Sequence, residues 1–310
     1  MFERIADDSV SGATTLTELA AREMASLAET WNAGDPGGIW DELLAACTAL
    51  VDAKREMASI VNFVSRLLAA AERVVLSGLS PEAVVQVVSA ECARTWQSIP
   101  DDLGALGREG ADLIRPGAAV VTLSSSGSVR AVLDAARAAG TAFRVVASEG
   151  SPRREGAALA DDLARAGFDT TLVVDAALPR LVERADLVLV GADCVSAEDF
   201  VNKIGTYPLL LAAADAGVPS YAAALLDKFL PKALRGSTDA VHPPEEVVAD
   251  PPDGLEIDNH YFEAVPTALL KGVVTESGIV EPSDIPERLR EQAVAPALLG
   301  VLFRKAEPTA

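Results

Sequence analysis

The sequence predicts an α/β protein, with an all-helical N-terminal domain followed by a Rossmann-like domain built on a parallel sheet. Two observations predict this fold. From Ala13 to about Leu113, apolar residues recur at helical spacing and no alternating strand pattern interrupts them. After Arg115-Pro116-Gly117, short apolar runs alternate with helical segments, which favours right-handed crossovers and a sheet covered on both faces. We therefore expect two domains, residues 1–114 and 115–310.

The helical half is expected to contain four helices. Asp35-Pro36-Gly37-Gly38 separates the first two, because glycine and proline interrupt a helix. Pro81 starts the fourth, since proline is tolerated at the first helical position. The apolar positions that define the four helices are Leu16, Leu19, Ala20, Met24 and Leu27; Leu43, Leu44, Cys47 and Leu50; Ile60, Val61, Val64, Leu67 and Leu68; and Val84, Val85, Val88 and Cys92.

Apolar runs of the second half are expected to form the sheet strands, with helices between them. The strands are residues 118–123, 143–147, 170–174, 187–190 and 218–224, and the helices are residues 129–139, 155–166 and 209–216. The segment from His242 to Gly254 is rich in proline and acidic residues, so we expect an exposed loop there. Beyond it, Tyr261–Val265 and Gly272–Thr275 are candidate strands, and Pro286–Glu291 is a candidate helix.

Composition narrows the function classes. The chain has 310 residues, and no unbroken apolar run approaches a membrane span. The N-terminus lacks the basic and apolar regions of a signal peptide, so we expect a cytoplasmic protein with no membrane partner. A net charge of −20 argues against a nucleic acid partner. Three scattered cysteines and two histidines indicate neither a disulfide framework nor a metal site, and we expect no cofactor.

One stretch, Asp186 to Pro231, concentrates the candidate chemistry. Its first apolar segment, Leu187–Val190, reads as a buried strand, and Asp193 follows just past the strand's end, where open α/β sheets bind their ligands. A polar loop then ends in Asn202-Lys203-Ile204-Gly205-Thr206, before an expected helix. Because a helix N-terminus offers free N–H groups and a positive dipole, this junction favours an anion such as a phosphate.

This stretch resembles the family that joins the α, β and δ subunits of eukaryotic translation initiation factor 2B to two sugar-phosphate isomerases. Those enzymes are methylthioribose-1-phosphate isomerase and ribose-1,5-bisphosphate isomerase. The matching segments are Val190-Gly191-Ala192-Asp193, Val201-Asn202-Lys203-Ile204-Gly205-Thr206 and Asp227-Lys228-Phe229. The resemblance implies a helical cap before a Rossmann-like domain, a homodimer formed through the C-terminal domain, and a small phosphorylated sugar or nucleotide as the partner.

Asp193 has two interpretations from its position. It could be a general acid or base that moves a proton between adjacent sugar carbons, or a residue that caps the following loop by accepting backbone N–H bonds. The resemblance favours catalysis, because in the isomerases the aspartate of the Gly-Ala-Asp segment is one of two proton-transfer residues. The neighbouring Cys194 is expected to be a small buried residue.

The second proton-transfer residue of the isomerases is a cysteine, and here Ser124 occupies its place. A hydroxyl is far less acidic than a thiol, so Ser124 cannot simply inherit that catalytic role. The alternative is a turn, Ser124-Ser125-Ser126-Gly127-Ser128, whose N–H groups and hydroxyls hold a phosphate at the start of a helix. We favour phosphate binding by this turn and keep Ser124 as a catalytic candidate beside Asp193.

Two arginines implied by the resemblance are also replaced. In Ser148-Glu149-Gly150-Ser151-Pro152-Arg153, Ser151 stands where the isomerases have the arginine of Glu-Thr-Arg-Pro. Ser11-Gly12-Ala13 resembles a phosphate-contacting Arg-Gly-Ala, again with serine for arginine. Losing two bidentate forks weakens or changes phosphate recognition. Arg153, Arg154 or Lys203 are candidates to compensate, and a solvated basic pair is the alternative for Arg153-Arg154.

The remaining ligand-binding candidates follow from the resemblance. Glu149, Asn202, Lys203 and Gly205 are expected to contact the ligand, and Lys228 to shape the pocket. For Thr275-Glu276-Ser277-Gly278 and Asn259, dimer packing and a role in the site remain equally open.

Three functions fit these residues. The favoured one is an initiation-factor-2B-like protein that keeps a sugar-phosphate or nucleotide-phosphate pocket for binding or regulation, with a degenerate isomerase site. The alternative is an active aldose–ketose isomerase of a phosphorylated ribose, of the ribose-1,5-bisphosphate or methylthioribose-1-phosphate type. A scaffold subunit that acts through its dimer surface is the third.

Overall fold

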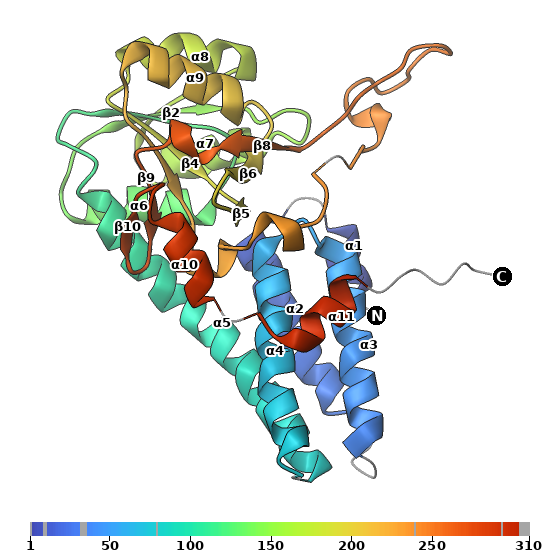
Figure 1. Cartoon of the computed structure of the whole chain (residues 1–310). Coiled ribbons are helices and arrows are strands. Elements are labelled where there is room, and N and C mark those ends of the chain that lie inside the picture. The colour runs from blue at the N-terminus through green and yellow to red at the C-terminus, as the bar shows by residue number, and fades with distance from the viewer. Residues whose placement is uncertain are drawn as a thin grey trace. The chain divides into compact units, whose positions relative to one another are not determined.

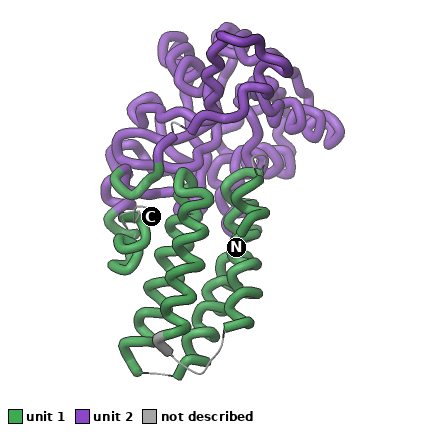
Figure 2. The backbone as a smooth tube through the Cα atoms, turned by 90° about the vertical axis from the view of Figure 1, so that its right-hand side faces the viewer, with its two compact units in different colours: residues 1–101, 233–236, 290–310 green, residues 102–232, 237–289 purple. Residues whose placement is uncertain are grey.

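The computed structural model describes residues 2–8, 11–31, 36–78, 80–238, 240–292 and 294–303. The chain forms two compact units (Figure 2). The first contains residues 1–101, 233–236 and 290–310, and the second contains residues 102–232 and 237–289. The sequence instead placed the boundary between residues 114 and 115, and that pair of domains, residues 1–114 and 115–310, remains a prediction.

The first unit is helical throughout its described part. Figure 1 shows α2, α3, α4 and the first part of α5 as long helices, and α11 packs against α3 and α4. Leu16, Leu43 and Leu67 of these helices are fully buried. The helices are α1 (Glu3–Asp7), α2 (Ala13–Ala28), α3 (Pro36–Lys54), α4 (Ala58–Leu76), α11 (Pro296–Leu302) and, as far as Asp101, α5 (Pro81–Ala111).

Two details of the first unit differ from the sequence prediction. The separator expected at residues 35–38 is wrong in part, because α3 already begins at Pro36; Asp35 lies outside the described residues. Proline fits the start of a helix, where its missing N–H costs nothing. α1 and α11 were not predicted, since helices this short carry too little periodicity to be recognised.

The second unit is built on a seven-stranded sheet in the order β10-β9-β7-β4-β1-β2-β3. All neighbouring pairs are parallel except β9 with β10. The strands are β1 (Ala119–Thr122), β2 (Arg144–Ser148), β3 (Asp169–Val173), β4 (Leu187–Gly191), β7 (Ser220–Ala223), β9 (Gly272–Thr275) and β10 (Gly278–Val280).

Apolar clusters cover both faces of this sheet. One contains Leu209 of α9 and Ile285 of α10, and the other contains Val132 of α6 and Leu163 of α7. The helices of this unit are α6 (Gly127–Ala138), α7 (Glu155–Arg165), α8 (Leu178–Leu181), α9 (Thr206–Ala216) and α10 (Ile285–Glu291). An α/β protein with a helical N-terminal region and a mostly parallel sheet is therefore confirmed, and the Rossmann-like description is consistent with it.

The segment after Asp193 is not the polar loop that the sequence suggested. It forms β5 (Cys194–Val195) and β6 (Asp199–Lys203), which join β8 (Phe262–Pro266) in a small antiparallel sheet. In β6 every residue is buried, so the alternating polar and apolar pattern of a half-exposed strand is absent and the prediction failed. The consequence is that Asn202 and Lys203 are held on a strand rather than on a loop.

Candidate active site

The site lies at the carboxyl edge of the large sheet, at the point where its connections change direction. β1 and β4 are parallel neighbours, yet β1 connects to β2 on one side and β4 leads on to β7 on the other. Open α/β sheets bind ligands at such a switch point, because the two connections diverge and leave a crevice. Ser124 follows β1 and Asp193 follows β4, so the two catalytic candidates occupy this edge.

Asp193 is a largely buried carboxyl group with a single cation beside it. Its side chain is 19% exposed, and Lys228 Nζ lies 4.0 Å from Oδ1 with a side chain only 5% exposed. Burial raises the pKa of Asp193, and the charge of Lys228 opposes that rise. Among the described residues, no backbone N–H donates to this carboxylate, so the structure does not show the loop cap considered as its alternative role. A carboxyl group held in this way can carry a proton at higher pH than a surface aspartate.

Lys228 is positioned by the 3₁₀ turn that follows β7. This turn, η3 (Leu226–Lys228), begins where the Glu276 carboxylate accepts the N–H of Leu226 at 3.0 and 3.2 Å. Burial raises the pKa of Glu276 to about 7, with contributions from the Asp227 and Asp102 charges. Glu276 therefore anchors the turn that carries the partner of Asp193, which gives the Thr275-Glu276-Ser277-Gly278 segment a place beside the site.

The serine turn differs from its sequence interpretation in extent. Gly127 and Ser128 are the first residues of α6, and Ser126 caps this helix by accepting the N–H of Val129 at 3.4 Å. Ser124 is buried in the left-handed conformation, with φ of 61°, and Ser125 is exposed. The Ser128 hydroxyl is buried and has no hydrogen-bond partner within the described structure. The turn thus offers a helix start and an unsatisfied hydroxyl beside β1.

Gly191 explains how the β1 and β4 ends come together. A Cβ at this position would lie 2.8 Å from Cβ and Oγ of Ser126 and 3.4 Å from Oδ1 of Asn202. Only glycine allows these side chains to approach the end of β4 so closely. Asn202 is oriented by its Nδ2, which donates to Thr206 Oγ1 at 2.9 Å. The structure therefore brings Ser126 and Asn202 to one point, as a shared ligand site requires.

The start of α9 is not the free anion site that the sequence suggested. The carboxylate of Glu263 on β8 accepts the N–H of Gly205 at 2.7 Å and that of Tyr207 at 2.9 Å. Gly205 has φ of 98°, which suits glycine at this turn. An anion does occupy the helix start, but it belongs to the chain itself, so the expected ligand role of Gly205 is not supported by this geometry.

Lys203 is buried and already paired. Its Nζ lies 3.1 and 3.2 Å from the two Glu155 carboxylate oxygens, and it lies 5.0 Å from the centre of the Tyr261 ring. The side chains of Lys203 and Glu155 are 5% and 16% exposed. Gly150 connects this pair to the serine turn, because a Cβ there would lie 3.3 Å from Glu155 Oε2 and 3.4 Å from Ser124 Cα.

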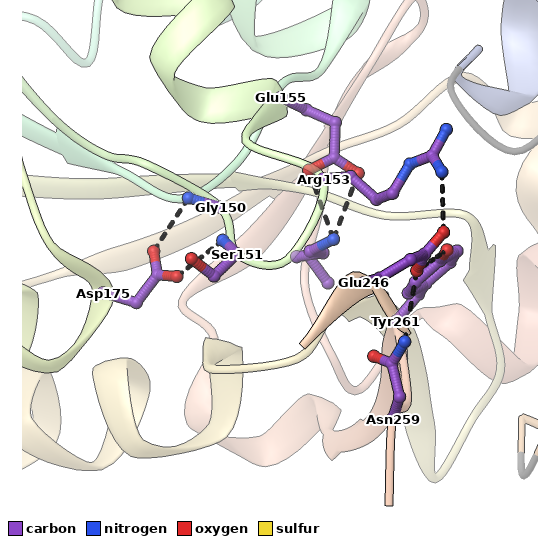
Figure 3. Close-up of polar contacts among 9 residues, drawn as sticks. Gly150, Ser151, Arg153, Glu155, Asp175, Glu246, Asn259 and Tyr261 are labelled. Carbon is purple, nitrogen blue, oxygen red and sulfur yellow. Dashed lines mark hydrogen bonds and ion pairs between the residues drawn. The ribbon is translucent and has the colours of Figure 1, made fainter. Parts of the chain in front are cut away.

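Arg153 joins a second carboxylate, Glu246, at 2.7 Å. Figure 3 shows Arg153, Tyr261 and Asn259 converging on Glu246. The Tyr261 hydroxyl donates to Glu246 Oε2, and Asn259 Nδ2 donates to the same oxygen at 3.1 Å. Burial alone would raise the pKa of Glu246, but the hydrogen bonds from Tyr261, Arg153 and Asn259 bring it below its ordinary value. Arg153 thus reaches the site, though paired with an acid rather than free for a ligand.

The loop after β2 is held by another acid. Asp175 accepts the N–H of Gly150 at 2.9 Å and that of Ser151 at 2.7 Å, as Figure 3 also shows. Glu149 lies 3.9 Å from Arg154, whose side chain is mostly exposed. The solvated basic pair proposed for Arg153-Arg154 therefore fits Arg154 and not Arg153.

Sequence reasoning missed several residues that this geometry makes important. Glu246 was assigned to an exposed loop, and it lies on the short turn η5 (Pro244–Glu246). Glu155 looked like an ordinary acidic residue in the first turn of a helix. No local pattern could have identified either one, because their partners Arg153 and Lys203 lie 93 and 48 residues away along the chain.

Over the part of the chain that the structure describes, no group of three or more metal-ligating side chains is placed to hold an ion. Within the same residues, no helix has both the length and the apolar character needed to cross a membrane.

Comparison with known proteins identifies the family. A sequence profile described as "Initiation factor 2 subunit family" matches residues 8–282. This protein belongs to the initiation factor 2 subunit family. Ribose 1,5-bisphosphate isomerase of Haloterrigena turkmenica is 31% identical over 307 residues, which cover 93% of this chain and 91% of the relative. The "putative translation initiation factor eIF-2B subunit 2-like" protein of Pyrococcus abyssi is 29% identical, with coverage of 89% and 93%.

A solved structure supports the same family membership. The crystal structure of the Pyrococcus horikoshii translation initiation factor eIF-2B matches with a TM-score of 0.79 and 25% identity, covering 92% of this chain and 97% of that one. The resemblance noted from the sequence is thereby confirmed. Within the initiation factor 2 subunit family, the relatives named as isomerases favour the enzyme alternative over the binding-only hypothesis that Ser124 suggested.

Proposed function

We propose that this protein is an aldose–ketose isomerase that acts on a phosphorylated ribose derivative. The observation that carries the proposal is Asp193, a buried carboxyl group at the switch point of the sheet with Lys228 at 4.0 Å. Burial raises its pKa, which favours the protonated form that can donate to a substrate oxygen. The relatives named ribose 1,5-bisphosphate isomerase support the reaction type.

In this proposal Asp193 both gives and takes a proton. Converting a cyclic aldose phosphate to an open ketose phosphate breaks the bond from the ring oxygen to C1, and the ring oxygen keeps the bonding electrons. The C2 hydrogen moves to C1 with its electron pair, the 2-hydroxyl becomes the carbonyl, and its proton goes in net terms to the ring oxygen. Protonated Asp193 donates to the departing ring oxygen, and its carboxylate then accepts the hydroxyl proton. Atoms balance without any co-reactant, and Lys228 steadies the carboxylate while it is charged.

The other predicted residues have supporting roles in this proposal. The serine turn and the start of α6 hold the phosphate through backbone N–H groups and the hydroxyls of Ser126 and Ser128. Asn202, oriented by Thr206, contacts a sugar hydroxyl. Ser124 hydrogen-bonds the substrate. It does not transfer a proton, because its hydroxyl is far less acidic than the thiol of the cysteine that the resemblance implies. A homodimer formed through the second domain and a cytoplasmic location remain predictions.

A binding or regulatory protein is the second candidate, and Ser124 is the specific observation that favours it. A serine in place of the cysteine leaves Asp193 as the one proton-transfer residue predicted by resemblance, and Ser151 removes a phosphate contact. A protein of this kind would bind a sugar phosphate or nucleotide without converting it.

The deciding experiment combines binding with turnover. Thermal shift with ribose 1,5-bisphosphate, ribose 1-phosphate, methylthioribose 1-phosphate, AMP and GMP identifies ligands, since a ligand of the folded state raises the melting temperature. NMR of each binding sugar then follows conversion of aldose to ketose. Conversion that Asp193→Asn abolishes supports the isomerase, and binding without conversion supports the regulatory protein.

A further inference from the structure

Two cations of the candidate site, Lys203 and Arg153, are already neutralised by carboxylates of the chain itself. Lys203 pairs with both oxygens of Glu155, and Arg153 pairs with Glu246 at 2.7 Å. Ser151 contributes no charge where the resemblance implies an arginine. A site that binds two phosphate groups needs uncompensated positive charge, and these pairs remove it.

We propose that Glu155 and Glu246 make this site selective for a pentose that carries one phosphate group over the corresponding bisphosphate. The inference rests on the proposed function, because it concerns the substrate of the same site. It assigns to both glutamates a role in specificity that follows from their contacts in this chain.

The Glu155–Lys203 pair is the stronger of the two determinants. The Lys203 side chain is buried and that of Glu155 is partly buried, at 5% and 16% exposure, and both Glu155 oxygens lie within hydrogen-bonding distance of Nζ. A phosphate that takes Lys203 must displace Glu155, which leaves a carboxylate beside a dianion in a poorly solvated place. Separating a buried pair and leaving one charge without a partner is strongly unfavourable.

Glu246 is held in place rather than being a surface acid that could swing away. Three donors, on Arg153, Tyr261 and Asn259, converge on its two oxygens (Figure 3). Its low pKa keeps it charged at neutral pH. A second phosphate near Arg153 would therefore meet a fixed negative charge, and repulsion between like charges opposes its binding.

A single phosphate avoids both costs. The start of α6 offers backbone N–H groups next to Ser126 and Ser128, and binding there separates neither glutamate pair. The free hydroxyl of a monophosphate at the other end of the sugar can donate to a carboxylate such as Glu155, which accepts hydrogen bonds only. The same carboxylates that oppose a second phosphate therefore recognise a hydroxyl in its place.

The test compares the dissociation constants of ribose 1-phosphate and ribose 1,5-bisphosphate by calorimetry. The wild-type protein is expected to bind the monophosphate at least about tenfold more tightly than the bisphosphate. Losing one hydrogen bond to a charged group raises a dissociation constant by about this factor or more. Glu155→Gln and Glu246→Gln should each improve bisphosphate binding and reduce that ratio about tenfold. Circular dichroism of both variants verifies that they fold, and the two variants serve as independent tests.

Asp161→Asn is the matched control, because Asp161 pairs with Arg165 at 2.7 Å on the exposed surface of the same helix. It should leave the ratio unchanged. Wild-type protein that prefers the bisphosphate, or that binds neither sugar, would overturn the inference, and so would an equal change of ratio in Asp161→Asn. Selective binding of the monophosphate without conversion to a ketose would uphold the charge selectivity while rejecting the isomerase.

Discussion

The carboxyl edge of the sheet has two sides of different character. The acid side consists of Asp193, Lys228 and Glu276, which follow β4, β7 and β9. The network side is a group of Arg153, Glu155, Lys203, Glu246 and Tyr261.

The acid side agrees with what the resemblance implies. A buried carboxyl group stands at the switch point, next to a buried lysine. The network side departs from it, because its cations are taken up by Glu155 and Glu246. The difference teaches that, under the proposed function, chemistry and recognition can change independently at one edge. The residue proposed for proton transfer is present, while the cations near it are paired within the chain.

The largest expected effect comes from the acid side. Asp193→Asn removes the proton-transfer group but keeps its shape, so kcat of isomerisation should fall about 10²- to 10⁴-fold. Sugar-phosphate binding, measured by thermal shift, should change far less. Turnover that survives this substitution would break the comparison, because the acid side would then have no chemical role.

Ser124 offers a gain of function at the boundary of the two sides. Ser124→Cys supplies the more acidic thiol at a buried position, so isomerase activity measured by NMR should rise at least about tenfold. Ser124→Ala is the matched control and should lower activity only by the loss of a hydrogen bond. If cysteine and alanine behave alike, the residue at position 124 does not take part in proton transfer.

Much of this edge could be predicted from the sequence, and the reason is local. Asp193 lies two residues after a continuous apolar strand, so its place past the end of β4 could be read from the sequence. Asn202 and Lys203 lie in a recognisable segment, but their place on the buried strand β6 could not. The pairs of the network side could not be predicted in the same way. Lys203 was considered as a ligand contact, and nothing near it in sequence shows that Glu155 neutralises it. Likewise, nothing near Gly205 in the sequence shows that its N–H donates to Glu263, which lies on the distant strand β8.

A moderate effect is expected from the partner of Asp193. Lys228→Gln removes the positive charge that opposes the rise in the pKa of Asp193, so that pKa should rise further. The pH at which activity falls on the alkaline side should therefore move upward, because Asp193 keeps its proton to higher pH. A pH–rate profile of the variant checks this. Identical profiles of variant and wild type would show that the charge of Lys228 does not affect the titration of Asp193.

The smallest expected effect concerns Glu276 and stability. Burial raises its pKa from 4.5 to about 7 in the folded state, so between these values the folded protein binds more protons than the unfolded chain. Its contribution to the free energy of unfolding should therefore decrease as pH rises from about 4.5 to about 7, since stability falls wherever the folded state holds the extra proton. Glu276→Gln cannot ionise and still offers an oxygen to the N–H of Leu226.

Melting temperatures between pH 5 and 8 provide the measurement. The wild-type protein should lose more stability over this interval than Glu276→Gln, because only the wild type must ionise a buried carboxyl group. Asp102→Asn removes one of the two negative charges that raise the pKa of Glu276 in the folded state, so the loss should be smaller and should end at lower pH. If the melting temperatures of the wild type and Glu276→Gln depend on pH in parallel, burial does not change the ionisation of Glu276 on folding. The contact between Glu276 and η3 would then not make stability depend on pH.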